Sequence, residues 1–265
     1  MIVVIDSVCL PGSEINQSSQ EEVLLNFLTA LGYDPLDPPL GDLLRRYHHL
    51  EGDWLIVSPV YWEASHNDAQ ILATGKALQW TEIQARDSYQ LFEQFVAADG
   101  MTLHYHSSDC WLLRIDNKPS IKSKPVKVVM KRSMMNELQG LDVSMYWQKF
   151  ITESQMFFSS QSMSPLVNGI WPWGASKLQS KALVVCVDEA LYSVACNSQT
   201  EVSLYKSSVL LKNYQLLLLE SLNNLSPNHQ QQLKKMPITW YWNDKTYTDR
   251  PNYLIRLWRH LIHAH

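Results

Sequence analysis

The stretch Asn168–Gly174 reads Asn-Gly-Ile-Trp-Pro-Trp-Gly and sets two indole rings two residues apart around a proline. Pro172 fixes its own φ and biases the preceding Trp171 toward extended backbone. We therefore expect a stiff aromatic turn at a corner between two subdomains. We also expect the rings of Trp171 and Trp173 to alternate, so that one is buried and the other lines a cleft, while the Asn168 amide bonds a backbone group.

Strands and helices alternate on both sides of this stretch. Apolar runs and period-two patterns predict strands at 2–5, 54–57, 70–72, 101–105, 110–115, 182–187 and 238–242, with an irregular stretch at 59–67. Caps and helical spacing predict helices at 19–31, from Thr81 to 99, at 142–158, at about 209–222, from Ser226 and at 251–262. The alternation indicates the α/β or α+β class, with a mixed sheet and flanking helices.

The composition excludes several classes of protein. Of the 265 residues, 46% are hydrophobic and 18% are charged, which excludes wholesale disorder. No uninterrupted apolar run reaches ~18 residues, and the start has no basic region before an apolar stretch, so we expect neither a membrane span nor a secretory signal. Four cysteines without a CxxC pair indicate thiols in a reducing compartment, not disulfides or a zinc site. We expect a cytoplasmic protein.

Charge is distributed unevenly along the chain. Residues 1–116 hold 17 acidic and 5 basic side chains (net −12), whereas residues 117–265 hold 9 acidic and 17 basic (net +8). The two parts could attract each other, or the second could face an anion such as a phosphoester or a protein partner. The overall charge of −4 argues against a nucleic-acid partner.

Two small groups of side chains are candidates for metal chemistry. His104 and His106 leave the same face of a predicted strand, a spacing that can bind a metal, but no third ligand follows at a useful spacing. Asp6 and Ser7 end the first strand, where α/β enzymes often place a metal carboxylate, although an ordinary strand-ending turn is the commoner explanation. Lysines at 118–132 could hold a phosphate or form a solvated linker. The nucleophile motif G-x-S-x-G and the phosphate-loop motifs are absent from the sequence.

Several stretches together resemble a known family. Residues 168–174 are similar to the N-x-[IL]-W-x-W-G-x-G segment of archaeal-type cofactor-independent phosphoglycerate mutases, and more closely to bacterial proteins of RpfE type. Glu153–Met156 resembles the E-x-Q-M helix of these proteins, and residues 54–62, 95–100 and 111–113 resemble further pieces in order. The resemblance implies a phosphoglycerate-mutase-like α/β fold. Residues 1–55 and 165–265 would form a remnant phosphatase-like core and 56–164 an inserted α+β unit, or the whole would be one compact domain.

The resemblance also implies a binding site for a small phosphorylated ligand. The residues that match its motifs are Asn168, Trp171, Trp173, Gly174, Glu153 and Gln155. The chain departs from the family where H-x-H-P-V-N-x-x-R is typical, because residues 157–165 hold neither His nor Arg, and Ser176 replaces the last glycine. Asp-His and D-x-x-x-H signatures for the two metal ions are missing as well.

Three hypotheses about function follow from these departures. The first is a catalytically degenerate protein of RpfE type with a binding or regulatory role and no cofactor. The second is an active phosphoryl-transfer enzyme, a mutase or phosphoesterase, that uses Mn or Zn through Asp6, Ser7, His104 and His106. The third, suggested by the uneven charge, is a scaffold for a protein partner.

Overall fold

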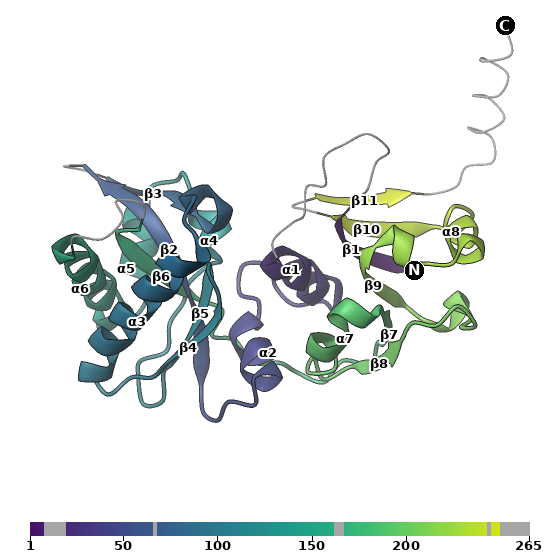
Figure 1. Cartoon of the computed structure of the whole chain (residues 1–265), viewed down its shortest axis with the longest axis horizontal. Helices are drawn as coiled ribbons and strands as arrows, with labels where there is room; N and C mark the ends of the chain where they lie inside the picture. The colour runs from purple at the N-terminus through teal and green to yellow at the C-terminus, as the bar shows by residue number, and fades with distance from the viewer. Residues whose placement is uncertain (8–19, 66–67, 162–166, 243–244, 250–265) are drawn as a thin grey trace, which may run out of the picture. The chain divides into compact units, whose positions relative to one another are not determined.

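The computed structural model describes residues 1–7, 20–65, 68–161, 167–242 and 245–249, and it divides into two compact units (Figure 1). Unit 1 combines residues 1–31 with residues 180–265, and unit 2 is the continuous segment Gly32–Gln179. Each unit has its own sheet with flanking helices. The predicted class, a mixed α/β protein with an inserted α+β unit, is confirmed.

Unit 1 is built on a six-stranded sheet of order β11-β10-β1-β9-β7-β8. β1 (Ile2–Ser7) is an inner strand and pairs in parallel with both of its neighbours, β9 (Leu216–Ser221) and β10 (Ile238–Trp242). The remaining strands are the parallel β7 (Val184–Val187) and β8 (Glu201–Leu204) and the antiparallel β11 (Lys245–Asp249). The carboxyl ends of β1, β9 and β10 therefore meet at one edge.

The core of unit 1 includes the apolar helix residues that the sequence pattern predicts to be buried. α1 (Gln20–Ala30) packs on β1 and β10 with its buried apolar stripe, Val23, Leu24, Phe27, Leu28 and Leu31. On β1, Val3 and Ile5 join a core cluster with Leu233 of α8 (Pro227–Leu233). The predicted start of α8 is confirmed, because the Ser226 hydroxyl accepts the N–H of His229. α7 (Glu189–Ala195), η2 (Leu211–Asn213) and η3 (Leu222–Asn224) complete the unit.

The helix predicted at about 209–222 is wrong, since β9 occupies Leu216–Ser221. Four consecutive leucines at 216–219 have high helix propensity but no polar face. In the structure all four are fully buried between the parallel strands β1 and β7. A strand covered on both faces needs no alternation of polar and apolar residues, which is why the periodicity was uninformative there.

Unit 2 is built on an antiparallel sheet of order β3-β2-β5-β4, with β6 also paired to β2. The strands are β2 (Trp54–Ala64), β3 (Ala69–Thr74), β4 (Leu103–Ser107), β5 (Cys110–Arg114) and β6 (Gly169–Trp173). The predicted hairpin of β4 and β5 is confirmed. β2 is longer than predicted, because Pro59 lies where the pairing along β2 passes from β5, up to Val57, to β3, from Val60. A proline is tolerated at such an interruption of the ladder.

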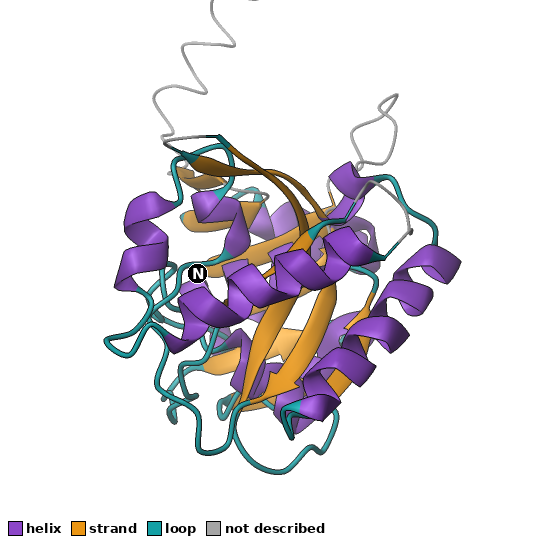
Figure 2. Ribbon diagram, turned by 90° about the vertical axis from the view of Figure 1, so that its left-hand side faces the viewer, coloured by secondary structure: helices purple, strands orange, loops and turns teal. Residues whose placement is uncertain are grey.

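The helices of unit 2 pack on this sheet and on one another (Figure 2). α3 (Glu82–Ala98) begins with the predicted capping box of Thr81 and Gln84. Its Phe92 stacks on Phe158 of α6 (Tyr146–Ser160) with ring centroids 5.3 Å apart. The other helices are α2 (Leu40–Tyr47), which packs on β2 and β5, together with η1 (Gly75–Leu78), α4 (Val126–Val129) and α5 (Met135–Gly140).

The boundaries of the inserted unit differ from those expected from the sequence. The sequence places them between residues 55 and 56 and between residues 164 and 165. The structure divides the chain at 31/32 and at 179/180. Residues 32–55 belong to unit 2 because they include α2, which packs on β2. Residues 165–179 belong there because they include β6, whose Pro172 and Trp173 pair with Val57 and Ile56 of β2.

A close approach of α2 to the end of β6 yields the first prediction. The Gly41 N–H donates to the Gly174 carbonyl at 3.0 Å, and a Cβ on Gly41 would lie 2.6 Å from that oxygen and 2.8 Å from the Trp54 carbonyl. Gly41→Ala should therefore lower the free energy of unfolding by about 1–3 kcal/mol. Urea denaturation measures the change.

Gly140→Ala is the matched control, because Gly140 also lies in a helix and a Cβ there meets nothing within 4 Å. It should leave stability unchanged or raise it by up to ~1 kcal/mol. Equal stabilities of the two variants would contradict the packing of α2 described above.

Candidate functional site

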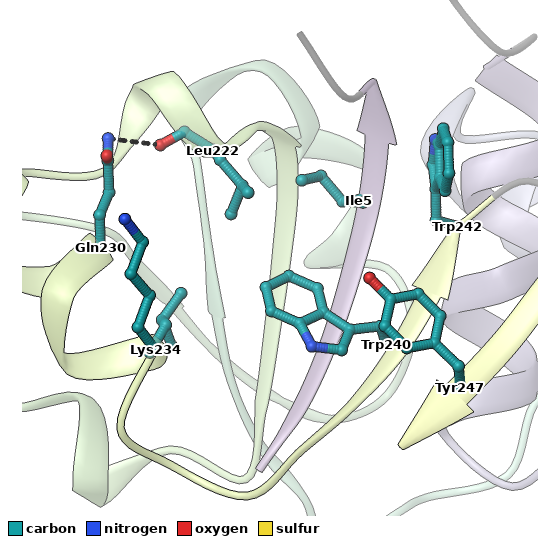
Figure 3. Close-up of a pocket in the computed structure, with 8 residues that line it drawn as sticks. Ile5, Leu222, Gln230, Lys234, Trp240, Trp242 and Tyr247 are labelled. Carbon is teal, nitrogen blue, oxygen red and sulfur yellow. Dashed lines mark hydrogen bonds between the residues drawn. The ribbon is translucent and has the colours of Figure 1, made fainter. Parts of the chain in front are cut away.

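A pocket of about 250 Å³ lies between α8 and one face of the unit 1 sheet (Figure 3). Ile5 of β1 and Trp242 of β10 are register partners near the ends of their strands, and Leu222 directly follows β9. α8 supplies the other side. The lining residues are Ile5, Leu222, Gln230, Leu233, Lys234, Trp240, Trp242 and Tyr247. Through Ile5, Leu222 and Trp242 the pocket extends toward the carboxyl ends of the strands, where open α/β sheets commonly bind ligands.

Three aromatic side chains form the sheet side of the pocket. Trp240 and Tyr247 are register partners on β10 and β11, and their rings lie nearly parallel, 17° apart with centroids at 6.3 Å. Trp242 follows Trp240 by two residues and so shares its face of the strand. The Trp242 Nε1 is buried and has no hydrogen-bond acceptor among the described residues. The indole nitrogens of Trp62 and Trp111 in unit 2 also lack an acceptor, so this feature is not particular to the pocket.

The side chains from α8 are polar and partly fixed. Lys234 is the C-cap residue of α8 and is exposed, so its charge lies at the rim of the pocket. The Gln230 Nε2 donates to the carbonyl oxygens of Leu222 and Leu225, both at 3.0 Å. These bonds tie α8 to the chain that follows β9. The pocket thus combines an aromatic wall with one amide and one cation.

Asp6 and Ser7 lie at the same end of β1 as this pocket. The backbone of Ser7 pairs with Ser221 at the end of β9. Their side chains lie outside the described part of the structure, so the role of Asp6 as a metal carboxylate stays a prediction. His104 and His106 belong to unit 2, so the four candidates for metal chemistry are divided between the two units.

Three histidines gather at the end of α2 in unit 2. His104 and His106 of β4 share a face of the strand, as their spacing predicts, because both contact His48. His48 is the C-cap residue of α2, and its Nε2 lies 2.9 Å from the Nδ1 of His106. No sequence pattern identifies His48 as a member of this cluster, because only the packing of α2 on the sheet brings it to β4. The His104 Nε2 is buried without a partner among the described residues.

The surroundings of these imidazoles favour their neutral forms. Burial, together with any positive charge on His106, His104 and His49, lowers the pKa of His48 to about 4. Burial also lowers the pKa of His104 and of His106, and the Asp109 carboxylate opposes the shift at His106. In the described ranges, no three His, Cys, Asp or Glu side chains are placed to hold a metal ion together. The cluster therefore acts as an uncharged packing element at neutral pH.

Trp171 and Trp173 are structural in this fold. Both are 0% exposed, which corrects the expectation that one lines a cleft. They lie in a strand, β6, where residues two apart share a face, so the expected alternation of the rings is also wrong. The Trp171 Nε1 donates to the Lys124 carbonyl at 2.9 Å, and the Trp173 Nε1 donates to the Ser58 Oγ at 2.9 Å. Both indole donors are therefore satisfied by protein groups.

The predicted backbone bond of Asn168 is confirmed. Its Oδ1 accepts the N–H of Trp62 at 2.8 Å, and its Nδ2 donates to the Trp62 carbonyl at 2.7 Å, so the side chain imitates a strand partner for β2. Gly174 has a φ of 71° and ends β6. On α6, Glu153 pairs with Lys149 at 3.5 Å, and Gln155 lies two residues further along the helix. All six residues that match the family motifs belong to unit 2, and the pocket belongs to unit 1.

Comparisons with known proteins give one structural similarity. No protein-family model matches the chain, and no curated protein matches it. Among solved structures, a cofactor-independent phosphoglycerate mutase from Thermoplasma acidophilum DSM 1728 is similar over 88% of this chain and 77% of its own. The identity is 12% and the TM-score is 0.34. Within the described residues, no helix combines the length and apolar character that crossing a bilayer requires.

The burial of both rings of β6 predicts similar effects of their removal. Trp171→Ala and Trp173→Ala should each lower the free energy of unfolding by about 3–5 kcal/mol, because each leaves a large cavity and an unpaired acceptor. At ~2–4 °C per kcal/mol, the melting temperature falls by roughly 10 °C in either variant. Thermal melts followed by circular dichroism test this, and a wild-type melting temperature in one variant would show that its ring is not core.

The histidine cluster predicts a loss of stability in acid. The unfolded chain takes up a proton at His48 near pH 6.5, whereas the folded chain does so only near pH 4, so stability is full above pH 6.5 and is lost between these values. Allowing for solvent screening, we expect the loss from His48 to be about 1–2 kcal/mol. Urea denaturation from pH 7.5 to pH 4 measures it.

His48→Gln keeps a donor for the His106 Nδ1 but does not titrate, so it should flatten this part of the stability curve. His49→Gln, at the exposed neighbour, is the control and should retain most of the acid-dependent loss, because His49 makes the smallest contribution to the lowered pKa of His48. Superimposable curves for the wild type and His48→Gln would refute the assignment.

Proposed function

We propose that this protein binds a small phosphorylated ligand in the pocket of unit 1 and does not turn it over. In this proposal it is a catalytically degenerate protein of RpfE type, related to the phosphoglycerate mutases through its W-x-W-G segment, with a regulatory role in the cytoplasm. The observation that carries the proposal is the pocket itself, which side chains of β1, β10, β11 and α8 enclose.

The lining of the pocket supports binding of an anion. Lys234 is a cation at the rim of the pocket. Phosphate oxygens are strong acceptors for an ammonium group. The aromatic side chains of the opposite side can contact the uncharged part of a phosphoester (Figure 3).

The lining also supports binding without chemistry. Its eight described residues include no carboxylate, imidazole or thiol, the side chains that hold Mn or Zn. Phosphoryl transfer also needs neutralisation of the developing charge, and in the described lining only Lys234 carries a positive charge. Hence no cofactor belongs to the proposal.

Replacing the rim cation tests the proposal. Lys234→Gln should weaken the binding of phosphomonoesters such as 3-phosphoglycerate and phenyl phosphate by about tenfold, because it replaces a charged donor with a neutral one. Lys235→Gln, one residue on and outside this pocket, should bind as the wild type does. Isothermal titration calorimetry measures both.

A turnover assay separates binding from catalysis. We expect no isomerisation of 3-phosphoglycerate and no release of phosphate from phenyl phosphate, with or without Mn²⁺ or Zn²⁺. Metal-dependent turnover that is lost in Asp6→Asn or Ser7→Ala would replace this proposal with the active phosphoryl-transfer enzyme. Failure of every phosphomonoester to bind would reject the ligand class.

A further inference from the structure

A second depression of unit 1 lies where η2 meets the end of α8. Its volume is about 360 Å³, and it shares no lining residue with the pocket described above. We call it the η2–α8 groove. The residues that line it are Leu210, Leu211, Lys212, Gln232, Lys235 and Met236.

The apolar side of the groove is held in place by the fold. Leu211 is 1% exposed and belongs to the core cluster of unit 1, and Met236 packs against the same cluster. Leu210, in contrast, is 59% exposed. Its carbonyl accepts the N–H of Asn213 at 3.0 Å, and the Leu211 carbonyl accepts the N–H of Tyr214 at 3.1 Å. This turn keeps one leucine in the core and leaves the other open to solvent.

The charged side of the groove consists of two lysines. Lys212 and Lys235 are exposed, and within the described ranges neither ammonium has a hydrogen bond or an ion pair. Lys124 and Lys177 of unit 2, by comparison, each pair with a carboxylate at 2.5 Å. The helix dipole accounts for a lysine just after the C-cap of α8, but not for Lys212. Because the six described lining residues include no Asp or Glu, the groove is positively charged.

This lining argues against three classes of ligand. A cation would meet two ammonium groups and no carboxylate. A single strand of nucleic acid stacks its bases on aromatic rings, and the six described lining residues include no ring. A bare phosphate would contact the lysines but leave Leu210 in water. A polypeptide segment that carries an apolar side chain between carboxylates matches both sides of the groove.

We propose that the η2–α8 groove docks an acidic segment of a partner protein, with an apolar side chain against Leu210 and Met236 and carboxylates beside Lys212 and Lys235. Opposite charges guide the encounter, and the apolar contact supplies affinity once water is excluded. Gln232 adds an amide that can bond the backbone of the docked segment. The groove needs no phosphate, so this inference does not rest on the proposed function.

Three peptides with blocked termini separate the charge from the apolar anchor. The probe is Glu-Glu-Leu-Glu-Glu, and its controls are Gln-Gln-Leu-Gln-Gln and Glu-Glu-Ala-Glu-Glu. By isothermal titration calorimetry of the full chain at low salt, the probe should bind roughly 2- to 30-fold more tightly than the glutamine peptide, which lacks both charge pairs. It should bind roughly 3- to 10-fold more tightly than the alanine peptide, which buries less apolar surface.

Variants of exposed residues locate the binding. Lys212→Gln and Lys235→Gln should each weaken binding of the probe about 2- to 5-fold, whereas Lys122→Gln, at an exposed lysine of unit 2, should leave it unchanged. Leu210→Ser should abolish the preference for the probe over the alanine peptide. Leu36→Ser, at a leucine of unit 2 that is 45% exposed, should retain that preference. Thermal melts check that all five variants fold.

The two sites of unit 1 can be tested separately. Lys235→Gln should weaken binding of the acidic peptide and not of 3-phosphoglycerate, and Lys234→Gln should do the reverse. Loss of peptide binding in Lys234→Gln alone would assign the peptide to the pocket and overturn the groove.

Four further results would overturn the docking of an acidic segment. The first is that none of the peptides binds. The second is equal binding of the probe and either control peptide, which would remove the charge or the anchor from the argument. The third is binding that survives Lys212→Gln, Lys235→Gln and Leu210→Ser alike. The fourth is a concentration-dependent dimer in analytical ultracentrifugation that Leu210→Ser abolishes, because a second copy of the chain would then be the occupant.

Discussion

The parallel pairing of β1 with both β9 and β10 is the interaction on which unit 1 depends. Val3, Val4 and Ile5 are no more than 1% exposed, so the strand is covered on both faces and can contain only apolar side chains along that run. β1 begins the chain and its two partners lie in the last fifty residues, with residues 32–179 inserted between. The entropic cost of closing so long a loop grows only slowly with its length, so a folded insertion is compatible with this pairing.

β2 has the corresponding role in unit 2, since it pairs with β3, β5 and β6. The segment with the most unusual composition, residues 168–174, is explained by this role. Asn168 extends the ladder with its side chain, and the indoles of Trp171 and Trp173 each find a protein acceptor in a fully buried place. Rare residues at fixed spacing are often taken to mark a ligand site, but here the hydrogen-bonding needs of buried indoles account for the pattern.

The sequence predicted those elements whose conformation depends on residues close together in the chain. The capping box at Thr81 and the cap at Ser226 involve groups three residues apart, and both were predictable from the sequence. The strand at 216–219 was not, because its four leucines owe their conformation to neighbours on both sides. α2 was not predicted, because it has only eight residues and follows a proline-rich stretch. His48 was missed with it, since its contact with His106 spans 58 positions in the chain.

The pocket of unit 1 could not be predicted from the sequence either, because it also depends on contacts between residues far apart in the chain. The strand at 238–242 was predictable, but its meaning depends on a register that sets Trp242 beside Ile5 and on an α8 that brings Lys234 to the same place. The Trp242 Nε1 lacks an acceptor among the described residues, and so do the indole nitrogens of Trp62 and Trp111 in unit 2, whereas both indoles of β6 are paired. An unpaired indole donor therefore occurs in both units and does not by itself mark a ligand site. What distinguishes the pocket is that side chains from β1, β10, β11 and α8, which are far apart in the sequence, enclose one space.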